Sequence, residues 1–194
     1  MALTAALLLA AGAGSRFAGD TPKLMAKLEG RPLIRWAADA AIAAEVGRLY
    51  VVTGEADVAS ALPSDCVVVS NPGWLRGLAT SLHKGIEAAR ADGYESVVVA
   101  LGDQPGITPD SWRAVAGATA TAIAVGTYDG RRGHPVRLAA DVWDSLPTDG
   151  EQGAGGLMRR HPELVTEVPC NSGTSADVDT EQDLVQFNSP TPSE

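Results

Sequence analysis

Short apolar runs recur along the chain and are separated by longer stretches of mixed polarity. The runs are rich in Val, Leu, Ile and Ala, and nearly every position inside each run is apolar. A strand that is covered on both faces has this pattern, whereas a half-exposed strand alternates apolar and polar residues. We therefore predict buried strands over residues 4–10, 48–53, 66–70, 96–101 and 122–128.

The stretches between these runs have helical patterns. Pro109 stands where the first turn of a helix accepts proline. Strands that alternate with helices form a mostly parallel sheet with helices on both faces. The predicted fold class is therefore α/β, a three-layer sandwich around a mostly parallel sheet. The predicted helices of this part of the chain cover residues 32–45, 55–61, 78–91 and 109–119.

The pattern changes after residue 128. Asp129-Gly130 is a hairpin signal, so we expect the chain to return in another short strand. We predict one domain over residues 1–187 and a disordered tail over 188–194. The remaining predicted elements are helices near 139–146 and 155–161, a strand near 164–168, and a final strand that runs into a C-terminal helix within 175–187.

Charge and hydropathy exclude some classes of partner. The 194 residues carry a net charge of −9, which argues against a large nucleic-acid surface because such a surface needs a basic face. No apolar run approaches the roughly 20 residues of a membrane span, and the first run leads directly into a glycine loop without a basic region before it. We expect a cytoplasmic protein with no nucleic-acid or membrane partner. Cys66 and Cys170 lack zinc-site spacing, so we expect buried free thiols.

Polar or glycine-rich stretches follow several of the predicted strands. They are the glycine loop after the first strand, "NPGWLRG" (71–77), "GDQP" (102–105) and "DVDT" (177–180). In an open parallel sheet, ligands bind at the carboxyl ends of the strands. We therefore predict that the four stretches meet at one edge of the sheet and form a single active site.

The glycine loop fits neither of two common nucleotide-binding motifs. Phe17 occupies the last small-residue position of a dinucleotide fingerprint, and Asp20 occupies the lysine position of a P-loop. What remains is a loop of backbone N–H donors over residues 11–15, followed by Arg16 and Lys23. That combination suits a triphosphate. The alternative is a plain glycine-rich turn with solvated Arg16 and Lys23.

Carboxylates near the ends of two predicted strands suggest a metal site. Asp103 follows a strand through one glycine, beside the predicted phosphate loop, where Mg²⁺ is commonly bound. Asp177 and Asp179, two residues apart on the predicted last strand, point the same way, so one of them completes the site. We favour Asp179. The alternatives are that Asp103 opens a turn and that Asp179 or Thr180 caps the C-terminal helix.

The stretches "LLLAAGAGSRFAGDTPK", "NPGWLRGLATSL", "LGDQP", "GHPV" and "DVDTEQDL" together resemble the MobA-like nucleotidyltransferases, nearest the molybdenum cofactor cytidylyltransferases. The matches run in order from Leu7 to Leu184. The resemblance implies a Rossmann-like, nucleotide-diphospho-sugar-transferase-like fold. It also implies transfer of CMP from CTP to the phosphate of molybdopterin with release of pyrophosphate. The spelling Leu-Ala-Ala-Gly favours CTP, because guanylyl relatives usually have Gly at the position of Ala11.

The resemblance also implies roles for individual residues. Lys23, Arg16 and Asp103 would be catalytic, Asp103 and Asp179 would hold Mg²⁺, and His134 and Gly153 would face the pterin acceptor. A molybdoenzyme is the implied recipient of the product. The nucleotide-binding residues implied by the family are Leu9, Ala10, Ala11, Gly12, Ala13, Gly14, Arg16, Lys23, Gly77, Ser81, Leu82 and Gly102.

The chain departs from the family pattern in two places. The spacing between Arg16 and Lys23 is longer than usual, and the loop Gly150–Gly155 lacks an arginine that relatives carry, which leaves the acceptor open. Three alternatives remain: a guanylyltransferase or another NTP transferase, a MobA-like NAD(P)H-dependent oxidoreductase, and a non-catalytic nucleotide sensor or molybdoenzyme chaperone.

Overall fold

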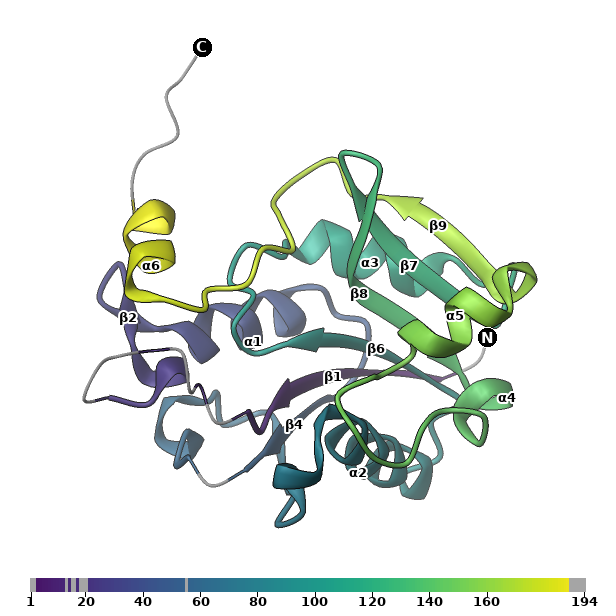
Figure 1. The fold of residues 1–194 in the computed structure, drawn as a ribbon, viewed down its shortest axis with the longest axis horizontal. Coiled ribbons are helices and arrows are strands. Elements are labelled where there is room, and N and C mark those ends of the chain that lie inside the picture. Colours follow the sequence, from purple (N-terminus) through teal and green to yellow (C-terminus); the bar gives the residue numbers. More distant parts are fainter. Residues whose placement is uncertain (1–2, 13, 15–16, 18–20, 55, 189–194) are drawn as a thin grey trace.

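A seven-stranded sheet forms the centre of the molecule (Figure 1). The computed structural model describes residues 3–12, 14, 17, 21–54 and 56–188. The strand order is β5-β4-β1-β6-β8-β7-β9, and only β8 among these described strands runs antiparallel to its neighbours. The mostly parallel sheet predicted from the apolar runs is therefore confirmed. Its strands are β1 (Thr4–Ala10), β4 (Leu49–Thr53), β5 (Val67–Ser70), β6 (Ser96–Leu101), β7 (Ile123–Tyr128), β8 (Arg131–Ala139) and β9 (Val165–Pro169).

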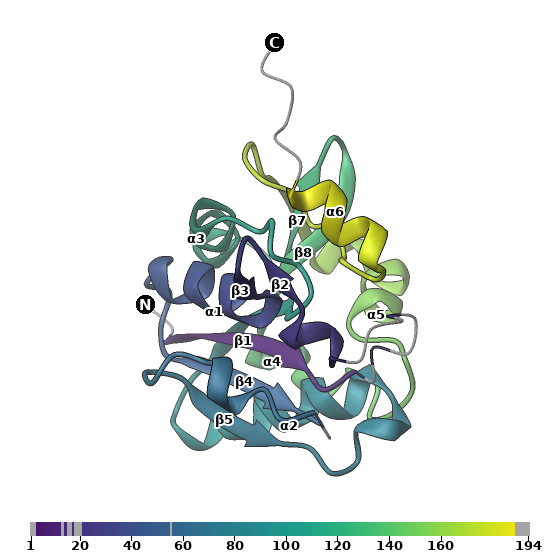
Figure 2. The same ribbon diagram turned by 90° about the vertical axis from the view of Figure 1, so that its left-hand side faces the viewer.

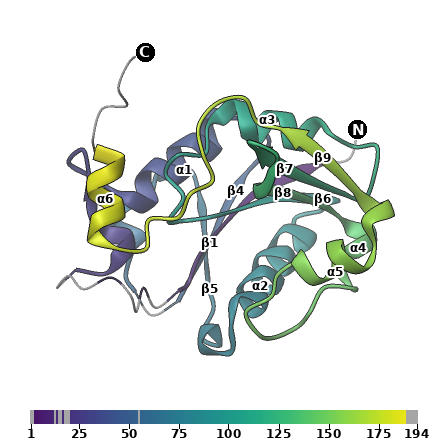
Figure 3. The same cartoon turned by 45° about the horizontal axis from the view of Figure 1, so that its top comes forward.

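Helices cover both faces of the sheet and complete the three predicted layers (Figure 3). One face packs against α1 (Leu33–Ala43) and α3 (Pro109–Gly117), and the other against α2 (Leu78–Ala91), α4 (Ala140–Trp143) and α5 (Gly155–Arg160). Strand β1 serves both cores, because successive side chains of a strand point to opposite faces. Leu8 lies in the core beneath α1, whereas Leu7 and Leu9 lie in the core beneath α2. This two-sided burial explains why the strand reads as a continuous apolar run.

A small satellite core joins the segment after β1 to the segment around α6. The short hairpin of β2 (Lys27–Leu28) and β3 (Arg31–Pro32) lies beside α6 (Glu181–Asn188) (Figure 2). Leu28 and Val178 are buried together there. The indole N–H of Trp36 donates to the carbonyl of Leu28 at 3.0 Å. The cluster holds the segment before α6 against the segment that carries Lys23, which matters for the site.

The predicted helix over 55–61 is wrong. Within the described residues this segment contains only a three-residue 3₁₀ turn, η2 (Ala59–Ala61), and Glu55 lies outside them. The carboxylate of Asp57 accepts a hydrogen bond from the amide of Ala59 at 3.2 Å, which closes a local turn that competes with a helix. Pro63 follows, and it disfavours helical conformation at the residue before it. Three further 3₁₀ turns are η1 (Lys23–Met25), η3 (Trp74–Arg76) and η4 (Pro162–Leu164).

The predicted final strand before the C-terminal helix is also wrong. Residues 174–179 form a loop that follows the turn after β6 instead of adding to the sheet. The amide of Val178 donates to the carbonyl of Asp103 at 2.9 Å, and the amide of Thr174 donates to Gly106 at 3.0 Å. Asp177 and Asp179 are therefore brought beside Asp103 by a loop and not by strand alternation.

The remaining predictions differ at element ends. The predicted helix 139–146 is realised as the single turn of α4. Residue 188, the first of the predicted tail, is the last residue of α6, and residues 189–194 lie outside the described part. No helix in the part of the chain that the structure describes is long and apolar enough to cross a membrane.

Candidate active site

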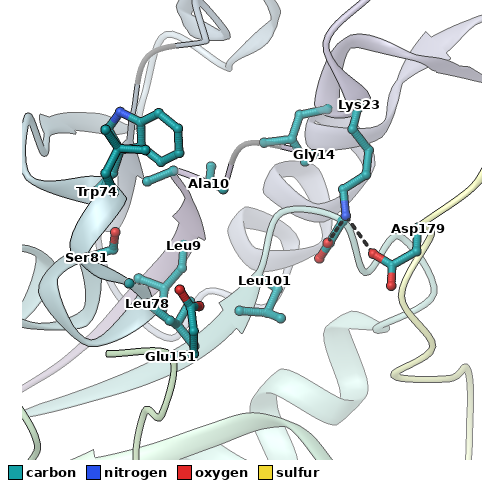
Figure 4. Close-up of a pocket in the computed structure, with 16 residues that line it drawn as sticks. Leu9, Ala10, Gly14, Lys23, Trp74, Leu78, Ser81, Leu101, Glu151 and Asp179 are labelled. Carbon is teal, nitrogen blue, oxygen red and sulfur yellow. Dashed lines mark hydrogen bonds and ion pairs between the residues drawn. The ribbon is translucent and has the colours of Figure 1, made fainter. Parts of the chain in front are cut away.

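Four loops at the carboxyl edge of the sheet enclose a pocket of about 470 Å³ (Figure 4). Three of them follow β1, β5 and β6, and the fourth precedes α6. The loop before α5 also contributes to the lining. Each loop therefore supplies lining groups from a different part of the sequence. The lining residues are Leu9, Ala10, Ala11, Gly12, Gly14, Lys23, Leu24, Trp74, Leu75, Gly77, Leu78, Ser81, Leu101, Asp103, Glu151 and Asp179.

The Lys23 ammonium lies between two carboxylates at one side of this pocket (Figure 4). Its Nζ donates to Oδ2 of Asp103 at 2.5 Å and to Oδ1 of Asp179 at 2.9 Å. Burial lowers the pKa of Lys23, but the hydrogen bonds and charges of Asp103 and Asp179 outweigh burial and raise the pKa above its usual value. Lys23 is therefore positively charged at neutral pH, although only 12% of its side chain is exposed.

A third carboxylate, Asp177, belongs to the same cluster. Burial raises the pKa of Asp177, and the charge of Asp103 raises it further. The amide of Gln104 donates to Asp177 Oδ1 at 2.8 Å and to the Ser175 carbonyl at 3.0 Å. Gln104 itself is 4% exposed. This buried amide fastens the loop before α6 to the turn after β6, which fixes the positions of the acidic groups.

The donor set of this cluster fits a divalent cation. Oδ1 of Asp103 is buried and has no hydrogen-bond partner among the described residues. Such an orphaned carboxylate oxygen is costly unless another positive group satisfies it. No group of three or more His, Cys, Asp or Glu side chains in the described ranges is arranged to hold a metal alone. Mg²⁺ commonly takes one or two carboxylates and completes its shell with water and substrate phosphates, so this arrangement suits it.

Two glycines allow the loops to approach closely. Gly14 has a φ of +59°, and a Cβ there would lie 2.8 Å from Cβ of Lys23. Gly77 has a φ of +106°, and a Cβ there would lie 2.3 Å from the carbonyl carbon of Gly150. Residues with side chains rarely adopt either conformation. Gly14 thus lets the first loop pack against Lys23, and Gly77 seats the loop before α5 on the start of α2.

A second cavity of about 260 Å³ adjoins the first and shares Leu9 and Leu78 with it. Its walls are mostly aliphatic and also include His134 and Gly153. Burial lowers the pKa of His134 to about 4, against the raising effect of the Asp103 charge. His134 is therefore neutral at pH 7. The Leu82 side chain also lines this second cavity instead of the first.

The MobA-like NTP transferase domain family matches residues 6–165. The chain belongs to this family.

Named relatives of this MobA-like chain cover part of it. The bifunctional protein GlmU of Gluconacetobacter diazotrophicus is 40% identical over 111 residues, which are 56% of this chain and 23% of that protein. The 2-C-methyl-D-erythritol 4-phosphate cytidylyltransferase of a Synechococcus species is 35% identical over 108 residues, 54% of this chain and 47% of that protein. The chain thus spans less than half the length of these two relatives.

A solved structure resembles the MobA-like chain over nearly its whole length. Rv0371c of Mycobacterium tuberculosis is 26% identical with a TM-score of 0.80, and the match covers 96% of this chain and 97% of that one. The same protein in complex with manganese is 25% identical with a TM-score of 0.76, with the same coverage of 96% and 97%. The α/β fold predicted from the sequence is shared with this neighbour.

The structure brings most of the residues predicted for the site into the larger pocket. Leu82, His134 and Gly153 instead line the second cavity. Gly102 lines neither; its amide donates to the Leu9 carbonyl at 2.9 Å. Ala13 and Arg16 lie outside the described residues. The predicted residues that line the larger pocket are Leu9, Ala10, Ala11, Gly12, Gly14, Lys23, Gly77, Ser81, Asp103 and Asp179.

Sequence reasoning missed six lining residues of the MobA-like pocket. Trp74 and Glu151 lie inside stretches that the sequence had marked, "NPGWLRG" and "GEQGAG", so their motifs carried a usable signal. Leu75, Leu78 and Leu101 also lie inside marked stretches, but their apolar side chains gave no reason to select them. Leu24 lies outside every marked stretch.

Proposed function

We propose that this protein transfers a nucleotidyl group from an NTP to a small phosphorylated acceptor, and that the reaction is transfer of CMP from CTP to the phosphate of molybdopterin. Pyrophosphate is the second product, and a molybdoenzyme is the recipient of the first. The observation that carries the proposal is the buried ammonium of Lys23 held by Asp103 and Asp179 beside a glycine loop. Membership of the MobA-like family supports the reaction class.

The proposed reaction needs no nucleophile from the protein. A phosphate oxygen of the acceptor attacks the α-phosphorus of CTP, and a new P–O bond forms. The bond from the α-phosphorus to the oxygen that bridges to the β-phosphate breaks, and its electron pair leaves with pyrophosphate. The protein contributes position and charge, which is sufficient for an in-line displacement in which one oxygen attacks phosphorus and another leaves.

Three sets of residues would perform this work. Asp103 and Asp179 would hold Mg²⁺, which supplies charge neutralisation and Lewis acidity at the phosphates when bound. The manganese complex of the related Rv0371c supports a divalent cation in this fold. Lys23, charged at neutral pH, would offset negative charge on the departing pyrophosphate. The main chain of the first loop would cradle the triphosphate together with Arg16.

Three observations support the finer assignment of substrates. Ala11, the residue that favours CTP, lines the pocket and is 7% exposed, which supports CTP as the nucleotide. A cytidylyltransferase is among the relatives. On the acceptor side, His134 and Gly153 line the adjoining cavity, which opens next to the nucleotide pocket through the shared Leu9 and Leu78. A neutral His134 would orient the acceptor and not exchange protons with it.

Pyrophosphate release tests this proposal. The protein is incubated with each of the four NTPs and Mg²⁺, with and without molybdopterin, and pyrophosphate is measured. We expect release with CTP that requires both molybdopterin and the metal. Release with GTP in place of CTP would overturn the choice of nucleotide, and release with another phosphate monoester in place of molybdopterin would overturn the acceptor. No release with any NTP would overturn nucleotidyl transfer.

A further inference from the structure

A buried polar network lies behind the nucleotide pocket, at the junction of β5 and α2. Asn71 directly follows β5, and Thr80 and Ser81 lie in the first turn of α2. All three are buried, with exposed fractions of 2%, 5% and 2%. Buried amides and hydroxyls must satisfy one another, so the direction of each hydrogen bond follows from the donors present.

Gly73 fixes the orientation of the Asn71 amide. The backbone N–H of Gly73 donates to Asn71 Oδ1 at 3.0 Å. A backbone N–H is always a donor, so this atom of Asn71 is the carbonyl oxygen and the other is the NH₂ group. That NH₂ group has two hydrogens. It donates one to Thr80 Oγ1 at 2.9 Å and the other to Ser81 Oγ at 3.0 Å.

The two hydroxyls differ in whether their own hydrogen has an acceptor within the protein. Thr80 accepts from Asn71 and donates its own hydrogen to the Gly77 carbonyl at 2.8 Å, so it is satisfied within the protein. Ser81 accepts from Asn71 in the same way, but its hydrogen has no acceptor among the residues that the structure describes. Ser81 lines the nucleotide pocket, and its hydroxyl faces the space near Leu9, Ala10 and Trp74 (Figure 4).

We infer that Asn71 is a positioning residue for base recognition: it fixes the Ser81 hydroxyl as a hydrogen-bond donor into the pocket. The ligand group that this donor takes is an acceptor on the edge of a nucleobase, either a carbonyl oxygen or an unprotonated ring nitrogen. The inference rests on the proposed function, because it requires that the pocket bind a nucleotide. It adds a residue that never touches the ligand and acts on it through Ser81.

The test separates the base from the phosphates. In the presence of Mg²⁺, dissociation constants are measured for the NTP that the wild type binds most tightly and for inorganic triphosphate, which has no base. The readout is the dissociation constant for the NTP divided by that for inorganic triphosphate. A charge effect on phosphate binding changes both constants and therefore cancels in this ratio. Asn71→Asp keeps the size of the side chain and the acceptor for Gly73, but its carboxylate takes the Ser81 hydrogen. We expect this ratio to rise about tenfold in Asn71→Asp, as loss of one hydrogen bond implies.

Two further variants test whether Asn71 acts through Ser81. Ser81→Ala removes the donor and should raise the ratio by a similar factor, and adding Asn71→Asp to it should cause no further rise, because Asn71 acts through Ser81. Thr80→Val is the matched control. It removes the Thr80 hydroxyl, which accepts from the same Asn71 amide but does not line the pocket, and it should leave the ratio unchanged.

The outcomes that contradict the inference differ from those that contradict the function. An unchanged ratio in Asn71→Asp, or a further rise in the double variant, overturns the role of Asn71 while nucleotide binding stands. An equal rise in Thr80→Val overturns it as well, because the effect would then come from general disruption of the network. If the wild type binds no NTP, both the inference and the proposed function fail.

Discussion

The two carboxylate oxygens of Asp103 have different surroundings, and this difference gives the sharpest prediction for a single residue. One of its oxygens accepts from Lys23, and the other is buried without a partner in the described part of the chain. Asp103→Ala should lower kcat by at least about 100-fold, because it removes a charge that would hold the metal beside the reacting phosphates. Pyrophosphate release at increasing Mg²⁺ measures the effect.

Asp110→Ala is the control for this substitution. Asp110 is an exposed carboxylate in the first turn of α3 and pairs with Arg113 at 2.5 Å, so its loss removes the same charge away from the pocket. Both variants should keep the far-ultraviolet circular dichroism of the wild type. Turnover by Asp103→Ala at the wild-type rate in saturating Mg²⁺ would refute the metal assignment.

His134 should make the stability of the fold depend on pH. In the unfolded chain His134 has a pKa near 6.5, and in the folded protein burial lowers this pKa to about 4. Between these values the unfolded state binds the proton more tightly, so stability falls as the pH drops from about 6.5 to 4. The free energy of unfolding should lose at most about 3 kcal/mol from this group across that range.

Urea denaturation at pH 7 and pH 4.5 measures this dependence. His134→Gln should lose less stability between the two pH values than the wild type does, because it has no group to protonate there. His161→Gln, at an exposed histidine paired with Glu163, should behave like the wild type. An identical loss of stability in His134→Gln and the wild type would show that His134 does not contribute.

At the scale of elements, the start of α2 depends on one glycine. A Cβ at Gly77 would meet both an unfavourable φ of +106° and the backbone of Gly150. Gly93, just beyond α2, has a φ of +83° but open space around a Cβ. Gly93→Ala therefore measures the conformational penalty alone, which is about 1 to 2 kcal/mol.

Gly77→Ala should cost more than Gly93→Ala in the free energy of unfolding and should also weaken nucleotide binding. The extra cost comes from moving the loop of residues 148–153, which contributes Glu151 to the pocket. Its residue Gly150 also makes one backbone hydrogen bond to Ala79 in α2 and one to Arg76 in η3. Thermal unfolding of both variants compares the costs, and a titration with CTP compares the sites. Equal losses in the two variants would mean that the contact with Gly150 is unimportant.

The sequence predicts best the elements whose hydropathy pattern is set by burial alone. The central strands read as continuous apolar runs because both faces are covered, and they lie where they were predicted. The segment before α6 fails because its acidic residues are spaced as in a strand, while its backbone pairs with the turn after β6. Residues 55–61 fail because a local turn at Asp57 competes with helix formation. Both failures come from hydrogen bonds that hydropathy does not register.

For the whole molecule, the sequence predicted that the loops meet at one edge of the sheet better than it predicted how their groups contact one another. The loops could be placed at one edge because parallel strands share their carboxyl ends. Lys23, however, lies 80 positions from Asp103 and 156 from Asp179. Their ion pairs depend on the satellite core that joins the segment after β1 to the segment around α6, and no local pattern reveals that long-range packing. Leu82, which was predicted for the nucleotide site, lines the adjoining cavity, and the sequence does not distinguish the two cavities for a similar reason.

Ligand-linked stability tests the function of the whole molecule without requiring the acceptor. The protein carries a net charge of −9, and its pocket holds more carboxylates than ammonium groups among the described residues. A triphosphate without a divalent cation should therefore bind poorly, whereas CTP with Mg²⁺ should bind well. A ligand at 100 times its Kd stabilises the folded state by about 2.7 kcal/mol, which for a chain of this size raises the Tm by roughly 5 to 10 °C.

Four thermal scans distinguish the function classes. CTP with Mg²⁺ should raise the Tm, while CTP with a chelator, Mg²⁺ alone and NADPH should leave it nearly unchanged. Asp103→Ala should lose the shift, because the cation would no longer be held beside Lys23. A shift with NADPH and none with CTP and Mg²⁺ would favour hydride transfer over nucleotidyl transfer. An equal shift with CTP in the chelator would show that Lys23 and the main chain bind the triphosphate without a metal, and would remove Asp103 and Asp179 from nucleotide binding.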